Sequence, residues 1–347
     1  MKKIIVIGGG FAGSYIAKKL EKKFEVILID AKEYFEFTPG ILRTLVEPEH
    51  AKKIQILHKD YLKNCRIILG KVKDIRGNFV LANKEKIFFD YLAICAGSGY
   101  NAPFKEGVVI ATRAKTLQNH SASLERAKNI LIIGGGLVGV ELAGEICWKY
   151  GDRKKVTIVH AKERLIERNH FKAINYAEDY LRKKGVEIIC GERIVRHEGN
   201  KFFSDRGRKV ETDLAFLCTG ITPNFEFMKK NLSESLNGKN QIKVNEFLQL
   251  EEKQNIFVAG DVNDRNEEKT AQNAVRQGQI VAKNILALDG NRELKTYFSK
   301  QTPLVISLGK YRGIFSAQSF TFGGFTPAFM KWAVEKKEMW KKRFINS

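Results

Sequence analysis

Two glycine-rich segments carry the clearest chemical signal in this chain of 347 residues: IGGGFAG at residues 7–13 and IGGGLVG at 133–139. Each follows an apolar run, at 4–8 and 130–134, and precedes a stretch with helical periodicity. In such a unit the first glycine makes the strand-to-helix turn, the second lets the backbone approach a pyrophosphate, and the third lets the helix pack on the strand. The amides at the start of the helix then face the phosphates. Two such units predict two dinucleotide sites, and a chain with two such sites is suited to passing electrons between them.

The strand after each glycine segment ends at a residue that can contact a ribose. Asp30 lies about 20 residues beyond the first segment, where an acid accepts hydrogen bonds from a ribose diol. His160 holds the corresponding place in the second unit, with Lys162 and Arg164 close by. Because no acid is present there, the 2′-phosphate of NADPH would not be repelled. The cations either bind that phosphate or are surface charge without selectivity.

The rest of the chain supplies the elements that position these sites. A strand pattern ends in YLAICAG at 91–97, and the second unit continues through alternating strands and helices to AFLCTGITPN at 215–224. NIFVAGDVND at 255–264 precedes a helical pattern through 271–288, and 303–325 reads as two strands around a turn. This order predicts an α/β fold with two Rossmann-like dinucleotide-binding domains and a small C-terminal α+β domain.

Composition narrows the class of protein. Lys plus Arg exceed Asp plus Glu by 21, an excess that favours anionic cofactors, anionic lipid or nucleic acid. No two of the five cysteines are closer than 28 residues, so CxxC and zinc-knuckle spacings are absent, and the dispersed histidines predict no metal site. The first strand follows Met1 almost at once, which leaves no room for a signal peptide, and no apolar run reaches about 18 residues. We expect a protein of the cytosol or of the inner face of a membrane.

The C-terminal segment predicts a basic amphipathic helix over 327–345, with Thr326 as a cap and Pro327 in the first position. At about 100° per residue, four side chains fall within a narrow arc: Phe329, Ala333, Trp340 and Phe344. Cations flank this arc: Lys336, Lys337 and Arg343. Charged residues cover the back: Lys331, Glu335, Glu338 and Lys342. This pattern predicts a helix in the headgroup region of an anionic membrane; packing on its own domain, or on a second subunit in a homodimer, is the alternative.

Taken together, these segments resemble the two-dinucleotide-binding-domain flavoprotein family, which has the pyridine nucleotide-disulfide oxidoreductase fold, over nearly the whole chain. In that family the first glycine segment binds FAD, the second binds NAD(P)H, and a strand ending in Gly-Asp contacts the flavin ribityl chain. The resemblance implies a discontinuous FAD-binding domain over 1–103 and 245–290 and an NAD(P)H-binding domain over 104–244. Residues 291–347 would then form a C-terminal membrane-interface domain.

The resemblance also implies which residues contact the cofactors. Ala96-Gly97-Ser98 is similar to the family's Ala-Thr-Gly turn with the threonine replaced, and Cys218-Thr219-Gly220 is similar to its second copy. The implied cofactor-binding residues are Gly8, Gly10, Phe11, Ala12, Gly13, Asp30, Ala31, Pro39, Val72, Ala96, Gly97, Ser98, Gly134, Gly136, Leu137, Val138, Gly139, His160, Thr219, Gly220, Gly260, Asp261, Thr270 and Ala271.

Disulfide reductases of the family carry a CxxxxC pair that this chain lacks, because no cysteine precedes Cys65. FTPG at 37–40, GVELAGEI at 139–146 and KTAQNAVRQGQ at 269–279 instead resemble type II NADH dehydrogenases and the related apoptosis-inducing-factor-like ferroptosis suppressors, although Arg276 replaces a usual glutamine. The resemblance implies four catalytic residues: Glu141 beside the nicotinamide, Lys269 stabilising negative charge on reduced flavin, and Gln272 and Gln277 contacting a quinone.

The function implied by this resemblance is FAD-dependent, non-electrogenic NAD(P)H:quinone oxidation in a respiratory chain, at the cytoplasmic side of the cell membrane. NADH is the expected donor, with NADPH at least tolerated. The enzymatic alternatives are an NAD(P)H oxidase and a sulfide:quinone reductase-like flavoprotein. The alternative from another class is a basic flavoprotein that binds nucleic acid; no helix-turn-helix, finger or RNP pattern is present, so we expect no specific nucleic acid partner.

Overall fold

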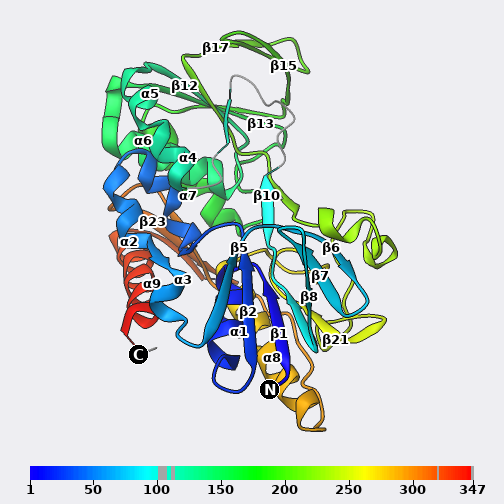
Figure 1. Ribbon diagram of the computed structural model, residues 1–347. Helices are drawn as coiled ribbons and strands as arrows, with labels where there is room; N and C mark the ends of the chain where they lie inside the picture. The colour runs from blue at the N-terminus through cyan, green and yellow to red at the C-terminus, as the bar shows by residue number, and fades with distance from the viewer. Residues whose placement is uncertain (101–107, 111–113, 319, 345–347) are drawn as a thin grey trace.

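The computed structural model describes residues 1–100, 108–110, 114–318 and 320–344. Figure 1 shows two α/β units, one above the other, with the C-terminal segments along one side. Each unit is built on a mainly parallel sheet whose strands are apolar on both faces, as expected for sheets that are covered on both sides. The expected α/β fold with two Rossmann-like sheets is confirmed. The predicted domain boundary at 103/104 lies outside the described residues.

The first sheet combines strands from distant parts of the chain. In spatial order they are β20 (Gln249–Leu250), β21 (Lys253–Val258), β9 (Tyr91–Ile94), β1 (Lys3–Ile7), β2 (Glu25–Asp30) and β5 (Cys65–Leu69). All neighbouring strands run parallel except β20 and β21. Helices α1 (Phe11–Leu20) and α8 (Ala271–Asp289) pack together so closely that a Cβ on Gly278 would lie 3.0 Å from the Ala12 carbonyl oxygen. This contact holds the first glycine segment against the later part of the chain.

The second sheet is parallel throughout. In spatial order its strands are β11 (Val108–Ile110), β18 (Leu214–Leu217), β12 (Asn129–Ile133), β13 (Lys155–His160) and β14 (Glu187–Cys190). Helix α6 (Leu137–Tyr150) follows the second glycine segment, and α7 (Phe171–Lys183) connects β13 to β14. Two short strands, β10 (Ser98–Tyr100) and β19 (Ile221–Pro223), pair where the chain passes between the two units.

Smaller elements complete the two units. Antiparallel pairs and triplets are β3 (Tyr34–Glu36) with β4 (Gln55–Leu57), then β6 (Val72–Arg76), β7 (Phe79–Ala82) and β8 (Glu85–Phe88), and β15 (Ile194–Glu198), β16 (Lys201–Ser204) and β17 (Lys209–Glu211). Short helices are η1 (Thr38–Leu45), η2 (Pro48–His50), α2 (Ala51–Ile54), α3 (His58–Tyr61), α4 (Ala114–Asn119), α5 (Ser121–Arg126), η3 (Gly151–Arg153), η4 (Glu226–Met228) and η5 (Ser233–Ser235).

The C-terminal segments form a sheet and a helix that lie against both units. The expectation of two strands over 303–325 was incomplete, since three antiparallel strands are present: β22 (Leu304–Ser307), β23 (Gly313–Ala317) and β24 (Phe320–Gly324). Helix α9 (Phe325–Phe344) begins two residues before the predicted start, and the predicted end at 345 lies outside the described residues. Pro327 fits because the first turn of a helix does not need its missing amide.

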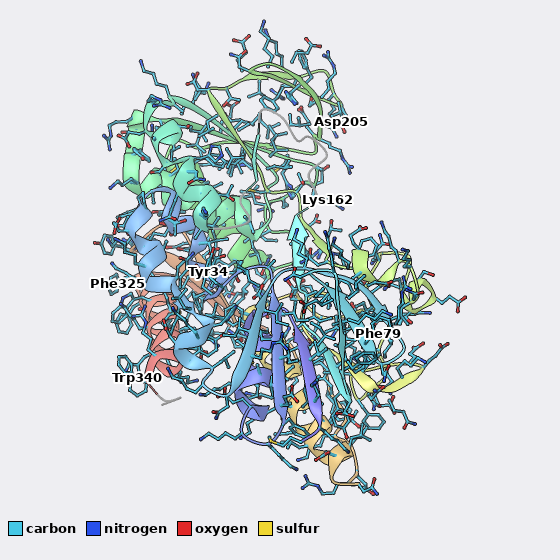
Figure 2. All side chains as sticks on the ribbon, in the orientation of Figure 1. Tyr34, Phe79, Lys162, Asp205, Phe325 and Trp340 are labelled. Atoms are coloured by element: carbon cyan, nitrogen blue, oxygen red, sulfur yellow. The ribbon has the colours of Figure 1, made fainter. Side chains whose placement is uncertain are left out.

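Helix α9 turns its charged side inward and its aromatic side outward. Glu335 and Met339 are 7% and 3% exposed, whereas Phe329, Trp340 and Phe344 are 53–60% exposed. Figure 2 shows Phe325 and Trp340 on the outer side of this helix. The helix does pack on its own chain, but through the charged side that the sequence pattern placed at its back. None of the described helices combines the length and the apolar character needed to cross a bilayer.

Lys342 illustrates this inward charge. Its Nζ donates to Ser14 Oγ at 2.8 Å and lies 4.1 Å and 4.8 Å from the ring centroids of Phe35 and Tyr61. Burial lowers the pKa of Lys342 to about 7, and the charge of Glu338 only partly opposes this shift. The folded protein therefore binds the Lys342 proton more weakly than the unfolded chain does.

We expect Lys342→Met to raise the melting temperature more at about pH 6 than at about pH 9, because the substitution removes a buried charge. Below about pH 7 the Lys342 amine is protonated in both the folded and the unfolded protein, so folding carries the full free-energy cost of burying the charge. Between about 7 and 10.5 only the unfolded chain holds the proton, so stability rises with pH over this range. Thermal melts at the two pH values measure the difference, with Lys337→Met, at an exposed lysine of the same helix, as the control. Equal shifts at both pH values would contradict this account.

Candidate functional site

The first glycine segment joins β1 to α1, and each predicted glycine has its own steric role. Gly8 has a φ of +92°, and a Cβ there would collide with the carbonyl oxygen of Cys95. A Cβ on Gly13 would collide with the carbonyl oxygen of Gly8, so the helix can pack this close only with glycine. Gly10 faces open space, with no heavy atom within 4 Å of a Cβ built on it. The space in front of Gly10 is where a pyrophosphate would approach the backbone.

The second segment repeats this geometry between β12 and α6. Gly134 has a φ of +110°, and a Cβ on Gly139 would collide with the Gly134 carbonyl oxygen. Gly136 faces open space as Gly10 does. No described side chain caps α1 at Gly10 or α6 at Gly136, so the amides of both first turns remain available. Both helix starts therefore fit the pyrophosphate of a dinucleotide.

Asp30 is held in place by two donors at the end of β2. Its Oδ2 accepts from the Gly9 amide at 2.8 Å and lies 3.1 Å from His58 Nε2. His58 Nδ1 lies 2.7 Å from the Tyr61 hydroxyl, and the imidazole is fully buried. Burial raises the pKa of Asp30, but the His58 hydrogen bond and the Lys32 charge outweigh it, and the net shift is downward. The carboxylate thus remains a hydrogen-bond acceptor, which the predicted contact with a ribose requires.

His160 occupies the matching place in the second unit. Its Nδ1 accepts from the Gly135 amide at 3.1 Å, as Asp30 does from Gly9. Burial is the main cause that lowers the pKa of His160, and Lys162 adds to it. At neutral pH this leaves a neutral imidazole whose Nε2 is a donor. Arg164 is held elsewhere, since its Nε donates to Glu178 at 3.0 Å.

The other predicted cofactor residues surround these two loops. Phe11 packs edge-on against Phe35 and Phe37, with ring centroids 5.1 and 5.7 Å apart. Along the chain the rest lie as follows: Ala12 in the first turn of α1, Ala31 exposed after β2, Pro39 in the first turn of η1, Val72 buried at the start of β6, Leu137 and Val138 in the first turn of α6, and Thr219 and Gly220 just after β18. Their contacts with bound cofactors stay predictions.

The turn at Ala96-Gly97-Ser98 meets the Gly260-Asp261 pair. Ser98 Oγ donates to Asp261 Oδ2 at 2.8 Å across 163 positions of sequence. Burial raises the pKa of Asp261, although the Ser98 hydrogen bond and the Lys269 charge oppose this. The two segments that the family resemblance assigned to one cofactor therefore lie side by side at the ends of β9 and β21.

Three of the predicted residues at the start of α8 have defined partners. Thr270 caps the helix, its hydroxyl accepting from the Asn273 amide at 3.3 Å. Lys269 Nζ donates to the Asn263 carbonyl oxygen at 2.8 Å, and burial lowers the Lys269 pKa against the charge of Asp261. Gln272 is exposed, and its Nε2 lies 3.4 Å from the Pro303 carbonyl oxygen. Ala271 is the first residue of the helix.

Gln277 lies in a different environment from the one expected for a quinone contact. The side chain is 1% exposed. Its Oε1 accepts from the Gly260 amide at 2.6 Å and from Asn263 Nδ2 at 2.7 Å, while Nε2 donates to Glu267 at 2.6 Å. Because the amide is buried and bonded at both ends, we replace the quinone contact with a positioning role for the Gly260 turn.

A pocket lies where both α/β units meet the C-terminal segments. Its lining includes Pro39, Gly40 and Arg43 of η1, Glu141 and Glu145 of α6, and Ser307, Lys310, Lys331, Trp332 and Glu335 of the C-terminal part. The Glu141 Oε1 atom accepts from Lys331 Nζ at 2.6 Å and from the Ser307 amide at 2.8 Å. Glu141 and Lys331 are 15% and 18% exposed, so the ion pair is largely shielded from water. The predicted catalytic glutamate thus faces the C-terminal segments.

A further ion pair and a polar pair line the same pocket. Arg43 binds Glu145 through two hydrogen bonds, of 2.9 Å and 3.3 Å, and Ser307 Oγ donates to the same carboxylate at 3.2 Å. His50 Nε2 lies 3.2 Å from Glu335 Oε2. Breaking one member of such a buried pair leaves an uncompensated charge, so these pairs fix the relative positions of the three parts of the chain.

Sequence reasoning missed most of this pocket. Arg43, Glu145 and His50 were not singled out, and Lys331 was predicted only as one of the charged residues at the back of its helix. Glu145 could have been noticed, because it lies four residues after Glu141 and so shares its helix face. The partners of these residues are 102 to 285 positions away, and no local pattern indicates them.

Residues 2–278 match the family described as pyridine nucleotide-disulphide oxidoreductase. The chain belongs to this family. It is 35% identical to apoptosis-inducing factor homolog A of Dictyostelium discoideum, over 95% of this chain and 88% of that protein. It is 29% identical to ferroptosis suppressor protein 1 of Homo sapiens, over 92% and 90% of the two chains. The family resemblance is confirmed, and the chain is an NAD(P)H-dependent flavoprotein oxidoreductase.

Two solved structures share the fold. NDH2 from Plasmodium falciparum in complex with NADH superposes with a TM-score of 0.87, at 16% identity and over 99% of this chain and 96% of that one. The sulfide:quinone oxidoreductase of Aquifex aeolicus gives the same TM-score at 21% identity, over 99% and 92%. At these identities the likeness shows the fold alone.

The cysteines of this family member are poorly suited to the thiol chemistry of its disulfide-reducing relatives. Burial raises the pKa of Cys95 and of Cys218 to about 12. Both lie directly after the central strands β9 and β18, beside the two glycine turns. A thiol with so high a pKa is a poor nucleophile at neutral pH, which favours a route that passes electrons without cysteine.

Proposed function

We propose that this flavoprotein is a non-electrogenic NAD(P)H:quinone oxidoreductase that works at a membrane surface. The observation that carries the proposal is the pocket between η1, α6 and α9. Pro39 and Gly40 form one side of it and Lys331 the other, so it adjoins the segment that the family resemblance assigns to the flavin ring. The helix that closes the pocket, α9, exposes an aromatic face, which suits a substrate dissolved in lipid.

The residues at the two glycine segments support the cofactor assignment. Gly8, Gly10 and Gly13 with the start of α1 would hold the FAD pyrophosphate, and Asp30 its ribose. The second segment and His160 would hold NAD(P)H. When bound, FAD accepts a hydride from NAD(P)H and passes two electrons to the acceptor. The protein's part is to bind, orient and exclude water.

The charges around the pocket define what the chain itself contributes. Lys331 Nζ would donate a hydrogen bond to an acceptor oxygen, with Glu141 holding the ammonium in place at 2.6 Å. Lys269 and the positive end of α8, which begins at Ala271, would favour negative charge beside them. Gln272, exposed on the same helix, would face the acceptor from the outside. The protein would bind the cytoplasmic side of the cell membrane peripherally, through α9.

We expect two separable half-reactions in stopped-flow experiments on the FAD-loaded protein. Anaerobic mixing with NADH should bleach the visible flavin absorbance, and a second mixing with menaquinone or ubiquinone should restore it faster than air-saturated buffer does. Restoration by air as fast as by quinone would favour an NAD(P)H oxidase. Bleaching by sulfide as fast as by NADH would favour a sulfide:quinone reductase.

A further inference from the structure

A second groove lies beside the pocket, between α2 and α9. It is lined by Glu49 of η2, by Lys52 and Lys53 of α2, and by five residues of α9: Lys336, Met339, Trp340, Arg343 and Phe344. Glu335 lines the pocket and Met339, one helical turn later, lines the groove. The groove therefore follows the pocket along α9, on the side nearer the end of the helix.

The floor of this groove is apolar. Met339 is 3% exposed, whereas Trp340 and Phe344 are 54% and 60% exposed and their ring centroids lie 6.1 Å apart. Two large aromatic side chains in water are costly unless something covers them. Their position beside a buried methionine gives the occupant an apolar surface to lie against.

The rim of the groove is cationic. Lys53, Lys336 and Arg343 are exposed around it, and Lys52 is drawn to Glu49 at 2.6 Å. Among the described residues, no carboxylate lies within ion-pair distance of Lys53 or Lys336. Arg343 donates to the carbonyl oxygen of Lys52 at 3.2 Å, which holds its guanidinium at this rim. Glu49 offsets the charge of Lys52, and the three remaining cations, Lys53, Lys336 and Arg343, leave a net positive charge that favours an anion in the groove.

We infer that the groove between α2 and α9 binds one anionic phospholipid, with the phosphate between Lys53, Lys336 and Arg343 and the acyl chain against Trp340, Met339 and Phe344. The combination of an apolar floor and a cationic rim matches the two parts of such a lipid. Two other occupants match the groove less well. A second copy of the chain would place the same cations opposite one another, and the tail of a quinone carries no anion to pair with them. The inference rests on the membrane part of the proposed function and extends it to a defined lipid site.

The test is cosedimentation of the full-length, FAD-loaded protein with vesicles of phosphatidylcholine alone or mixed with phosphatidylglycerol. We expect clear preference for the mixed vesicles, and a loss of at least about tenfold in that binding for Lys53→Glu/Lys336→Glu. Lys183→Glu/Lys253→Glu carries the same change of charge at exposed lysines far from the groove and should bind as the natural chain does. The shift in tryptophan fluorescence on binding to mixed vesicles should be smaller for Trp340→Phe than for the natural chain.

The outcomes separate this inference from the proposed function. Lys53 and Lys336 lie outside the pocket, so reduction of a water-soluble short-chain quinone without vesicles should be unchanged in the double variant. Equal binding to both kinds of vesicle, or equal losses in the two double variants, would overturn the lipid site. The lipid site would also be overturned if the protein showed no preference between the vesicles and formed dimers that Lys53→Glu/Lys336→Glu strengthened. If the protein binds anionic vesicles through these lysines but reduces no quinone, the proposed function is refuted and the lipid site is not.

Discussion

Glu141→Gln should slow quinone-linked oxidation of NADH by about a hundredfold. The Glu141 carboxylate is the only negative charge bonded to Lys331 among the described residues, and it also accepts from the Ser307 amide. Glutamine keeps the size of the side chain but removes its charge. The Lys331 ammonium would then be left largely shielded from water and without a counter-ion, so it would lose its position at the pocket.

Stopped-flow measurement of each half-reaction locates the defect. We expect Glu141→Gln to slow the restoration of flavin absorbance by quinone far more than its bleaching by NADH. Glu187→Gln, at an exposed position of the same unit, is the matched control and should leave both rates unchanged. If bleaching by NADH slows as much as restoration, Glu141 acts at the nicotinamide, as the family resemblance implied, and the role at the acceptor is wrong.

A double-variant cycle adds a check that does not depend on assigning the step. If Glu141 acts by holding Lys331, then Glu141→Gln combined with Lys331→Met should be little worse than either change alone. Independent roles would multiply the two losses instead.

The glycine segments were predictable because their requirements are local. The collision of a Cβ on Gly13 with the Gly8 carbonyl oxygen involves residues five positions apart, and the same spacing recurs at Gly134 and Gly139. The hydrogen bond from Gly9 to Asp30 is set by the strand–turn–helix–strand unit, so an acid at that distance could be recognised from sequence alone.

The pocket was not predictable in the same way, because its ion pairs join distant parts of the chain. Helical periodicity divided α9 into an aromatic side and a charged side, but periodicity alone does not state which side faces the protein. The charged side faces inward because the chain offers it partners there: Glu141 for Lys331, and His50 for Glu335. Gln277 was misplaced for the same reason, since its partners Gly260 and Asn263 come from another segment.

We expect His160 to influence the choice between NADH and NADPH: His160→Asp should lower kcat/KM for NADPH by about a hundredfold while leaving NADH within a few-fold. The His160 ring accepts from the Gly135 amide, where Asp30 stands in the first unit, so aspartate at 160 should accept that bond and the two hydroxyls of a ribose. The same carboxylate would lie against the 2′-phosphate of NADPH, and two negative charges at this distance repel each other strongly.

The neutral state of His160 explains why both nucleotides should be accepted by the natural chain. Because burial lowers its pKa, the imidazole offers a hydrogen-bond donor and no charge at neutral pH, so it can serve either nucleotide and does not repel the 2′-phosphate. Lys162, 60% exposed, would then supply a modest attraction that solvent screens, and Lys162→Met should reduce NADPH use by only a few-fold. Steady-state rates with NADH and NADPH, for the natural chain and the two variants, show which residue sets the nucleotide preference. If the ratio of NADPH to NADH use falls with Lys162→Met but not with His160→Asp, selectivity lies in the surface charge and not in the residue at the end of β13.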